Sequence, residues 1–164
     1  PRAWFFSFQD VESARKVLPE NSKYWQSLDG NWKFNWAPDP ESRPKDFYQP
    51  GFDVSAWDDI PVPSSWNVYG IQKDGSLKYG VPIYVTQPVI FQHSVKVDDW
   101  RGGVMRTPPT EWTTYKHRNE VGSYRREFDI PQDWDGREVF INFDGVDSFF
   151  YLWINGKYVG FSKN

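Results

Sequence analysis

Hydrophobic and polar residues alternate along several short segments of this chain, and the alternation predicts β-strands. In residues 31–36 the rings of Trp32, Phe34 and Trp36 alternate with polar residues. A period of two places the three rings on one face of a half-buried strand. Residues 89–97 are predicted to form another strand.

The strand signals are clearest in the last third of the chain. Residues 124–130 and 138–143 alternate, which predicts two strands with one apolar face each. Residues 149–154 are nearly all apolar, as expected of a central strand covered on both faces. Asn155-Gly156 then predicts a type I′ hairpin turn, after which residues 157–161 return antiparallel.

Proline and glycine mark the connections between these segments. Four prolines in residues 37–53 predict a surface connection, because proline cannot donate to a sheet ladder. Residues 70–80 and 98–121 are predicted to be irregular, and only residues 10–18 suggest a short helix, capped by Asp10. Short strands separated by turns predict an all-β fold, an antiparallel β-sandwich of jelly-roll type.

The composition excludes several classes of function. The chain has 164 residues, which fits one domain, and no cysteine, so it can form neither a disulfide nor a thiolate metal site. Its net charge is −3 with the two signs mixed, and no apolar run approaches the ~20 residues of a membrane span. We therefore expect no nucleic-acid and no membrane partner. The first residues do not resemble a signal peptide, and the compartment stays open between bacterial cytoplasm and periplasm.

Aromatic residues make up 20% of the chain. Each buried ring removes roughly 150–250 Å² from water, so one interpretation is a sandwich core built from rings. The other interpretation is a carbohydrate-binding surface, because rings stack on the apolar faces of sugars. The composition by itself favours the core.

Five segments, in order along residues 25–164, resemble the N-terminal domain of glycoside hydrolase family 2, in particular that of its bacterial β-galactosidases. The most specific is residues 143–162, which begin Phe-Asp-Gly-Val and continue through Trp-Ile-Asn-Gly to Val-Gly. The others are Leu28-Asp29-Gly30-Asn31-Trp32-Lys33-Phe34, Val62-Pro63-Ser64-Ser65-Trp66, Pro82-Ile83-Tyr84 and Gly122-Ser123-Tyr124.

The resemblance implies a galactose-binding-domain-like jelly roll over residues 27–164, truncated at its C-terminal end, with residues 1–26 as an extension packed on the sandwich. In this family catalysis is retaining and uses two glutamates of a downstream TIM barrel, whose carboxyl groups must lie roughly 5–5.5 Å apart. The resemblance therefore implies no catalytic residue and no cofactor in this chain. Any metal ion would belong to the barrel, and the full enzyme is expected to be a homo-oligomer.

The resemblance also suggests where the sugar would be contacted. The family's loop after Pro-Ile-Tyr supplies an asparagine to the galactosyl unit, and here Tyr84 is followed by Thr86 in that place. A threonine hydroxyl can make such a hydrogen bond, but it lacks the separate donor and acceptor of an amide. Trp100 and Trp112 in the irregular segment, with Tyr115, are further candidates for stacking on a sugar.

Other residues are of types that often take part in catalysis or metal binding, but no such role is expected for them here. Asn119-Glu120 resembles the acid/base pair of the family's barrel, yet it precedes a sandwich strand, so a solvated loop charge is expected. Glu127 and Asp129 share one face of a predicted strand and are expected to face solvent. The two histidines, His93 and His117, lack partners at ligand spacing, so no metal site is predicted. Ser64-Ser65 lacks the glycines of a nucleophile elbow.

The predicted function is therefore the non-catalytic N-terminal domain of a retaining β-galactosidase that hydrolyses terminal β-D-galactosides. The domain would pack on the downstream domains of its own chain and shape the rim of the barrel's active site. The alternatives are a domain of a β-glucuronidase or β-mannosidase, a stand-alone carbohydrate-binding module, and a structural adhesion domain. The sandwich fold alone does not decide between them.

Overall fold

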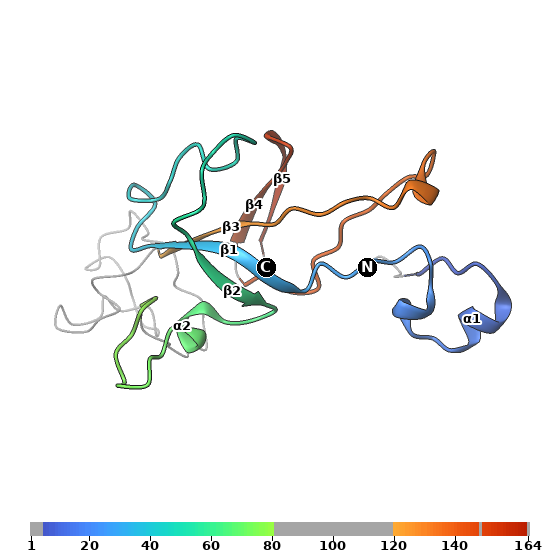
Figure 1. The fold of residues 1–164 in the computed structure, drawn as a ribbon, viewed down its shortest axis with the longest axis horizontal. Helices are drawn as coiled ribbons and strands as arrows, with labels where there is room; N and C mark the ends of the chain where they lie inside the picture. The colour runs from blue at the N-terminus through green and yellow to red at the C-terminus, as the bar shows by residue number, and fades with distance from the viewer. Residues whose placement is uncertain (1–4, 81–119, 148, 164) are drawn as a thin grey trace, which may run out of the picture. The chain divides into compact units, whose positions relative to one another are not determined.

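The computed structural model describes residues 5–80, 120–147 and 149–163, and Figure 1 shows the fold. The strands in those ranges are β1 (Gly30–Ala37), β2 (Asp58–Val62), β3 (Val121–Arg125), β4 (Phe149–Ile154) and β5 (Lys157–Lys163). The helices are α1 (Val11–Arg15) and α2 (Trp66–Tyr69), with the 3-10 turns η1 (Pro19–Asn21) and η3 (Gln132–Trp134). Every strand pairing among them is antiparallel, which confirms the predicted all-β sandwich class.

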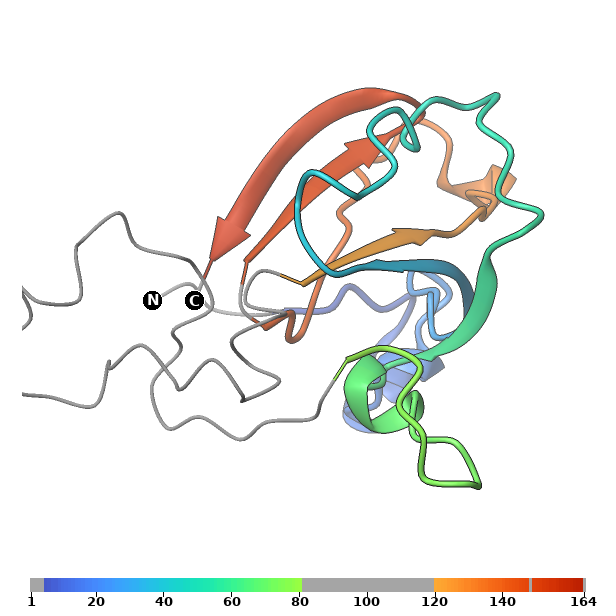
Figure 2. The same ribbon diagram turned by 90° about the vertical axis from the view of Figure 1, so that its left-hand side faces the viewer.

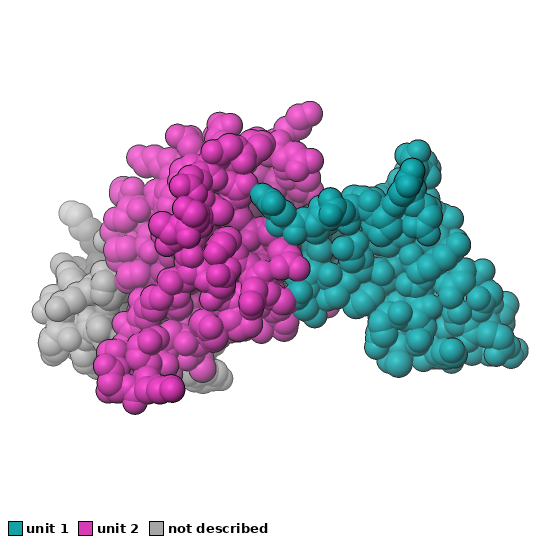
Figure 3. Space-filling view, viewed as in Figure 1, with its two compact units in different colours: residues 1–29, 127–142 teal, residues 30–126, 143–164 magenta. Residues whose placement is uncertain are grey.

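The described chain divides into two compact units, which Figure 3 colours separately. One unit consists of residues 1–29 and 127–142, and the other of residues 30–126 and 143–164. All five strands belong to the second unit. The predicted packing of residues 1–26 on the sandwich stays a prediction.

The three-stranded sheet has the order β2-β1-β3, so β1 is its central strand. Phe34 of β1 lies opposite Asp58 of β2 on one side and Tyr124 of β3 on the other. The predicted strand over residues 31–36 is thus confirmed, and its central position explains why Phe34 is fully buried.

Phe34 is the centre of the core. Its ring lies 4.8 Å from that of Tyr124, 5.0 Å from Tyr79 and 5.8 Å from Trp66, measured between centroids. Ile60 of β2 is also fully buried and belongs to the same cluster. The core is therefore built largely from rings, as the composition favours.

The second sheet is the β4–β5 hairpin. Asn155 and Gly156 at its turn have φ angles of 50° and 79°, the two positive values that a type I′ turn requires. The predicted hairpin is confirmed. Figure 2 shows both sheets of this unit from the side.

The connection between β1 and β2 contacts strands of both sheets. The guanidinium of Arg125 on β3 donates to the carbonyl oxygens of this connection at 2.9–3.4 Å; the acceptors are Phe47, Gln49, Pro50 and Phe52. The ring of Tyr48 stacks on Trp153 of β4 with centroids 5.3 Å apart and an interplanar angle of 12°. The proline-rich connection is therefore irregular as predicted, and side chains from β3 and β4 hold it near its middle.

Residues 7–24 and 132–137 hold the first unit together. The indole of Trp134 donates to the Lys23 carbonyl oxygen at 2.9 Å, and the Arg137 guanidinium lies 4.0 Å from the centre of the Tyr24 ring. Asp10 caps α1 by accepting from the Ser13 amide at 2.7 Å, as predicted. The helix is shorter than expected, because Val17 has a φ of 62°, which a right-handed helix does not allow.

Two predicted strands are wrong in extent or in existence. Residues 126–130 do not continue β3, and the Arg126 side chain donates to the Asn31 carbonyl oxygen on β1. Residues 138–143 form no strand, and Phe140 in that segment is 82% exposed. Alternation shows which face of a segment is apolar, but a strand also needs a neighbour, and none of the described strands pairs with either segment.

The prediction that residues 149–154 form a strand covered on both faces is also wrong for the described chain. The strand exists as β4, but its one described neighbour is β5, and the Tyr151 side chain is 56% exposed. An apolar run by itself does not distinguish a strand that is covered from one that presents rings to its surroundings.

We predict that Phe34→Ala lowers the free energy of unfolding by about 3–5 kcal/mol, because it empties the centre of the core. Phe140→Ala removes the same side chain from an 82% exposed site and should change it by less than about 0.5 kcal/mol. Urea denaturation of both variants measures the difference. Equal losses would contradict this assignment of the core.

We also predict that Gly156→Ala lowers stability by about 1–2 kcal/mol, since the residue has a φ of 79° that an L side chain adopts at a cost. A Cβ there would also lie 2.9 Å from Pro50 Cδ. The matched control is Gly145→Ala, whose Cβ meets nothing within 4 Å. Thermal unfolding followed by circular dichroism should separate the two variants.

Candidate functional site

The residues predicted to contact sugar lie outside the described residues: Tyr84, Thr86, Trp100, Trp112 and Tyr115. The same holds for His93, His117 and Asn119. These assignments stay predictions. The described chain includes both flanks of that segment, Tyr79–Gly80 before it and Glu120 after it.

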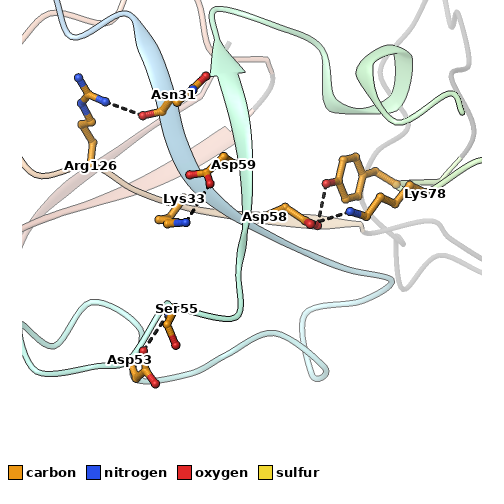
Figure 4. A network of polar contacts seen from close by, with 9 residues as sticks. Asn31, Lys33, Asp53, Ser55, Asp58, Asp59, Lys78 and Arg126 are labelled. Carbon is orange, nitrogen blue, oxygen red and sulfur yellow. Dashed lines mark hydrogen bonds and ion pairs between the residues drawn. The ribbon is translucent and has the colours of Figure 1, made fainter.

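A polar network anchors the first flank. The Lys78 ammonium lies 2.6 Å from Asp58 Oδ1, and the Tyr79 hydroxyl donates to Asp58 Oδ2 at 2.7 Å. Figure 4 shows the Lys78 side chain directed at the Asp58 carboxylate. A second pair, Lys33 with Asp59, joins β1 to β2 at 2.9 Å. The bonds of Lys78 and Tyr79 to Asp58 fix the loop over residues 70–80 to β2.

The charges in this network shift each other's pKa values. The hydrogen bond from Lys78 lowers the pKa of Asp58 below its usual 3.8, against an opposing effect of burial, and the Tyr79 hydroxyl adds to the lowering. The same bond raises the pKa of Lys78. Burial, followed by the bond to Asp58, raises the pKa of Tyr79 to about 12. At neutral pH the Tyr79 hydroxyl is therefore protonated and can donate its hydrogen bond to Asp58.

Beside the network lies a shallow pocket of about 210 Å³. The rings of Trp36, Trp57 and Tyr79 line it together with Asp58 and Lys78. Both oxygens of the Asp58 carboxylate already accept from Lys78 or Tyr79. The pocket thus combines aromatic walls with a carboxylate that is engaged by its neighbours.

The second flank is joined to the first by Asn67 of α2. Its amide Nδ2 donates to the Tyr79 carbonyl oxygen and to Glu120 Oε2, at 3.2 Å each. Glu120, expected to be a solvated loop charge, is instead half-buried and hydrogen-bonded. Sequence reasoning missed Asn67, Asp58 and Tyr79, because contacts between residues 12 to 53 positions apart leave no periodic signal.

The remaining candidate residues do not assemble a site. Glu127 and Asp129 are exposed as expected, but they follow the end of β3 and so do not share a strand face. The described residues contain no group of three or more His, Cys, Asp or Glu side chains that could hold a metal ion. Every helix in the described ranges is too short or too polar to cross a membrane.

Comparison with known families decides the affiliation of the chain. The model described as "Glycosyl hydrolases family 2, sugar binding domain" matches residues 25–164. The chain belongs to glycosyl hydrolase family 2. The resemblance predicted from five sequence segments is thereby confirmed over the same residues.

The relatives of this family 2 domain carry consistent names. A beta-galactosidase of Halalkalibacterium halodurans is 38% identical over 96% of this chain, which covers 13% of that protein. A beta-galactosidase of Priestia megaterium is 37% identical over 99% of the chain and is 14% covered. A beta-galactosidase large subunit of Lactobacillus helveticus is 32% identical over 96% of the chain and is 23% covered. The chain thus spans less than a quarter of the length of these relatives.

The structure explains why the family 2 motifs take the form they do. Phe143 packs on Phe150 at 5.0 Å between centroids, Trp153 stacks on Tyr48, and the Asn-Gly pair makes the hairpin turn. Gly122 leaves room for Trp66 and Phe34, since a Cβ there would lie 2.6 Å from Trp66 Cζ3. These motif residues are therefore determined by packing and turn geometry.

We predict that Asp58→Asn lowers the free energy of unfolding by about 0.5–1 kcal/mol at pH 7, since the carboxylate loses its charge opposite Lys78. The value is modest because the Asp58 side chain is 41% exposed and solvent screens the pair. The folded pKa lies below 3.8, so this stabilisation is present above pH 3.8 and is lost as the pH falls through the folded value.

The measurement is urea denaturation of the wild-type chain and the variant at pH 7 and at about pH 2, where the difference should shrink. Asp59→Asn, which removes the more exposed partner of Lys33, is the control and should cost less at pH 7. A difference that persists unchanged in acid would contradict the ionic role of Asp58.

Proposed function

We propose that this chain is the sugar-binding domain of a retaining β-galactosidase that hydrolyses terminal β-D-galactosides, and that it carries no catalytic residue itself. The observation that carries the proposal is its 38% identity, over 96% of the chain, with a protein named beta-galactosidase. Membership of family 2 and the beta-galactosidase names of the other relatives support it.

The geometry supports a non-catalytic role for the described residues. A retaining glycosidase needs two carboxyl groups roughly 5–5.5 Å apart on either side of the scissile bond. Glu120 is bonded to an amide, and Asp58 to an ammonium and a phenol. Each of these carboxylates is used to hold chain segments together.

The rest of the proposal concerns partners and substrate contacts. The domain would pack on other domains of a longer chain, because its relatives are several times longer. It would shape the rim of a barrel that carries the two glutamates, within a homo-oligomeric enzyme. Tyr84, Thr86, Trp100 and Trp112 are the residues we propose to approach the galactoside. Any metal ion would bind in the barrel.

A carbohydrate-binding module is the second candidate, and one feature favours it. The aromatic side chains of Tyr151, Tyr158 and Phe161 are 56–62% exposed on the β4–β5 hairpin. The centroid of the Tyr151 ring lies 6.3 Å from that of Tyr158 and 6.3 Å from that of Phe161. Exposed rings of this kind can stack on sugars, and they can equally be covered by another domain.

We predict that the purified 164-residue chain does not hydrolyse nitrophenyl β-D-galactoside, since it lacks the catalytic pair. We also expect it to bind galactose or lactose with at most millimolar affinity, since the barrel that carries the active site is not part of it. The longest natural polypeptide that contains these residues should hydrolyse the galactoside in preference to the matching glucuronide and mannoside. Turnover assays and calorimetry measure both.

The other outcomes are equally informative. Turnover by the 164-residue chain would contradict the non-catalytic role. Preference of the longer polypeptide for the glucuronide or mannoside would replace the galactosidase proposal by that alternative. Sub-millimolar sugar binding that NMR maps to the Tyr151 face, or to Trp100 or Trp112, would favour the binding module.

A further inference from the structure

Two surface pockets meet at the side chains of Asp58, Lys78 and Tyr79, which line both of them. The smaller pocket, described above, has a volume of about 210 Å³, and the larger has a volume of about 340 Å³. Together they reach the range of roughly 300–1,000 Å³ that is usual for small-molecule sites. We call these two adjoining pockets the Lys78 cleft.

The charges around the Lys78 cleft balance one another. Lys78 pairs with Asp58 at 2.6 Å, and Asp59, which lines the larger pocket, pairs with Lys33 at 2.9 Å. Each carboxylate that faces the cleft thus has an ammonium group beside it. Neither an anion nor a cation gains from binding where every charge already has an opposite neighbour. The cleft therefore favours a ligand without net charge.

The central ion pair can make hydrogen bonds beyond those within the protein. The side chains of Lys78 and Asp58 are 47% and 41% exposed, and Figure 4 shows the ammonium beside the carboxylate. An ammonium has three N–H donors and a carboxylate about four acceptor positions, of which the bonds among Lys78, Asp58 and Tyr79 use only a part. Because a hydroxyl both donates and accepts, two neighbouring hydroxyls can bind the ammonium and the carboxylate together.

The walls of the Lys78 cleft add aromatic surface to this pair. The rings of Trp36 and Trp57 line the smaller pocket, and Tyr69, which is 48% exposed, lines the larger one. Flat rings cover the apolar C–H face of a pyranose, whose hydroxyls lie around the edge of the sugar ring. A wholly apolar ligand would instead cover the ion pair without bonding to it, which is costly. A neutral sugar satisfies both features.

Both sides of the cleft are ordered by contacts within the protein. The loop that carries Lys78 closes on itself, since the Lys78 amide donates to the Gly70 carbonyl oxygen at 2.9 Å and the Gln72 amide to that of Ser76 at 2.8 Å. The Trp57 ring lies 5.9 and 6.1 Å from two phenylalanine rings of the β1–β2 connection, measured between centroids. Groups that are already held in place lose less conformational entropy when a ligand binds.

We propose that the Lys78 cleft binds a neutral saccharide, with the sugar ring against the aromatic walls and neighbouring hydroxyls on Lys78 and Asp58. Every group of this site lies between residues 33 and 79, within one compact unit. The site is open and its polar groups are partly exposed, so the expected affinity is about millimolar. Binding of this kind does not depend on whether the longer polypeptide is a galactosidase.

The experiment is an NMR titration of the ¹⁵N-labelled 164-residue chain, which follows backbone amide and tryptophan indole signals. Methyl β-D-galactoside should shift the signals of Trp57, Asp58 and Lys78 with a Kd of about 1–10 mM. Galactitol has the hydroxyls but no ring face, and galacturonate brings a negative charge next to Asp59. Each of these two should bind at least about five-fold more weakly than the galactoside.

Two variants test the cleft from different sides. K78M removes the ammonium but keeps an unbranched side chain, and it should weaken galactoside binding about ten-fold, because bonds to a charged group are lost. Y69L removes an exposed ring and should weaken binding several-fold, and it tests the site without breaking the ion pair. K157M and Y151L are the matched controls on the exposed β4–β5 hairpin and should bind like the wild type.

Several results would overturn this site. They are the absence of saturable shifts in the wild-type chain, equal binding by K78M and Y69L, and loss of binding in Y151L. Galactitol that binds as tightly as the galactoside would exclude the ring stacking, and tighter binding of galacturonate would exclude the preference for a neutral ligand. A longer polypeptide that hydrolyses no galactoside would overturn the proposed function only, because the titration measures binding without turnover.

Discussion

The burial of Phe34 is the interaction on which the described sheet and its neighbouring loops depend. Phe34 lies on the central strand, and the rings of Trp66, Tyr79 and Tyr124 reach it from α2, the following loop and β3. Each of these rings therefore fixes a different segment of the chain to the central strand. Packing on Phe34 brings the Tyr79 hydroxyl to Asp58 and the Tyr79 carbonyl oxygen to Asn67. The Tyr79 ring thus connects the hydrophobic core to these polar contacts.

The described polar groups around this core join segments of the chain to one another. Arg125 donates to four carbonyl oxygens of one connection, Asp58 accepts from Lys78 and Tyr79, and Asn67 joins Tyr79 to Glu120. Pairing a polar group with a partner is the condition for burying it at low cost. A family 2 domain built in this way is suited to present loops to a site whose catalytic groups lie elsewhere, as we propose here.

The high aromatic content has more than one physical cause in this molecule. Rings such as Phe34 and Trp66 fill the core between elements, and Tyr48 and Trp153 join a connection to the second sheet. Other rings, including Tyr151 and Phe161, are more than half exposed. The same residue types therefore fill the core, stack between a connection and a strand, and lie exposed on the surface. Composition alone cannot distinguish these three roles.

The sequence alone determined what depends on near neighbours in the chain. The period of two around Phe34 predicted β1, the Asn-Gly pair predicted the β4–β5 turn, and the ordered motifs identified the family. Tertiary structure decided what depends on partners distant in sequence. Residues 138–143 alternate without pairing to a described strand, and Glu120 meets Asn67 across 53 positions. Periodicity records which face of a segment is apolar, whereas the partner of that face, or of a single amide, exists only once the chain has folded.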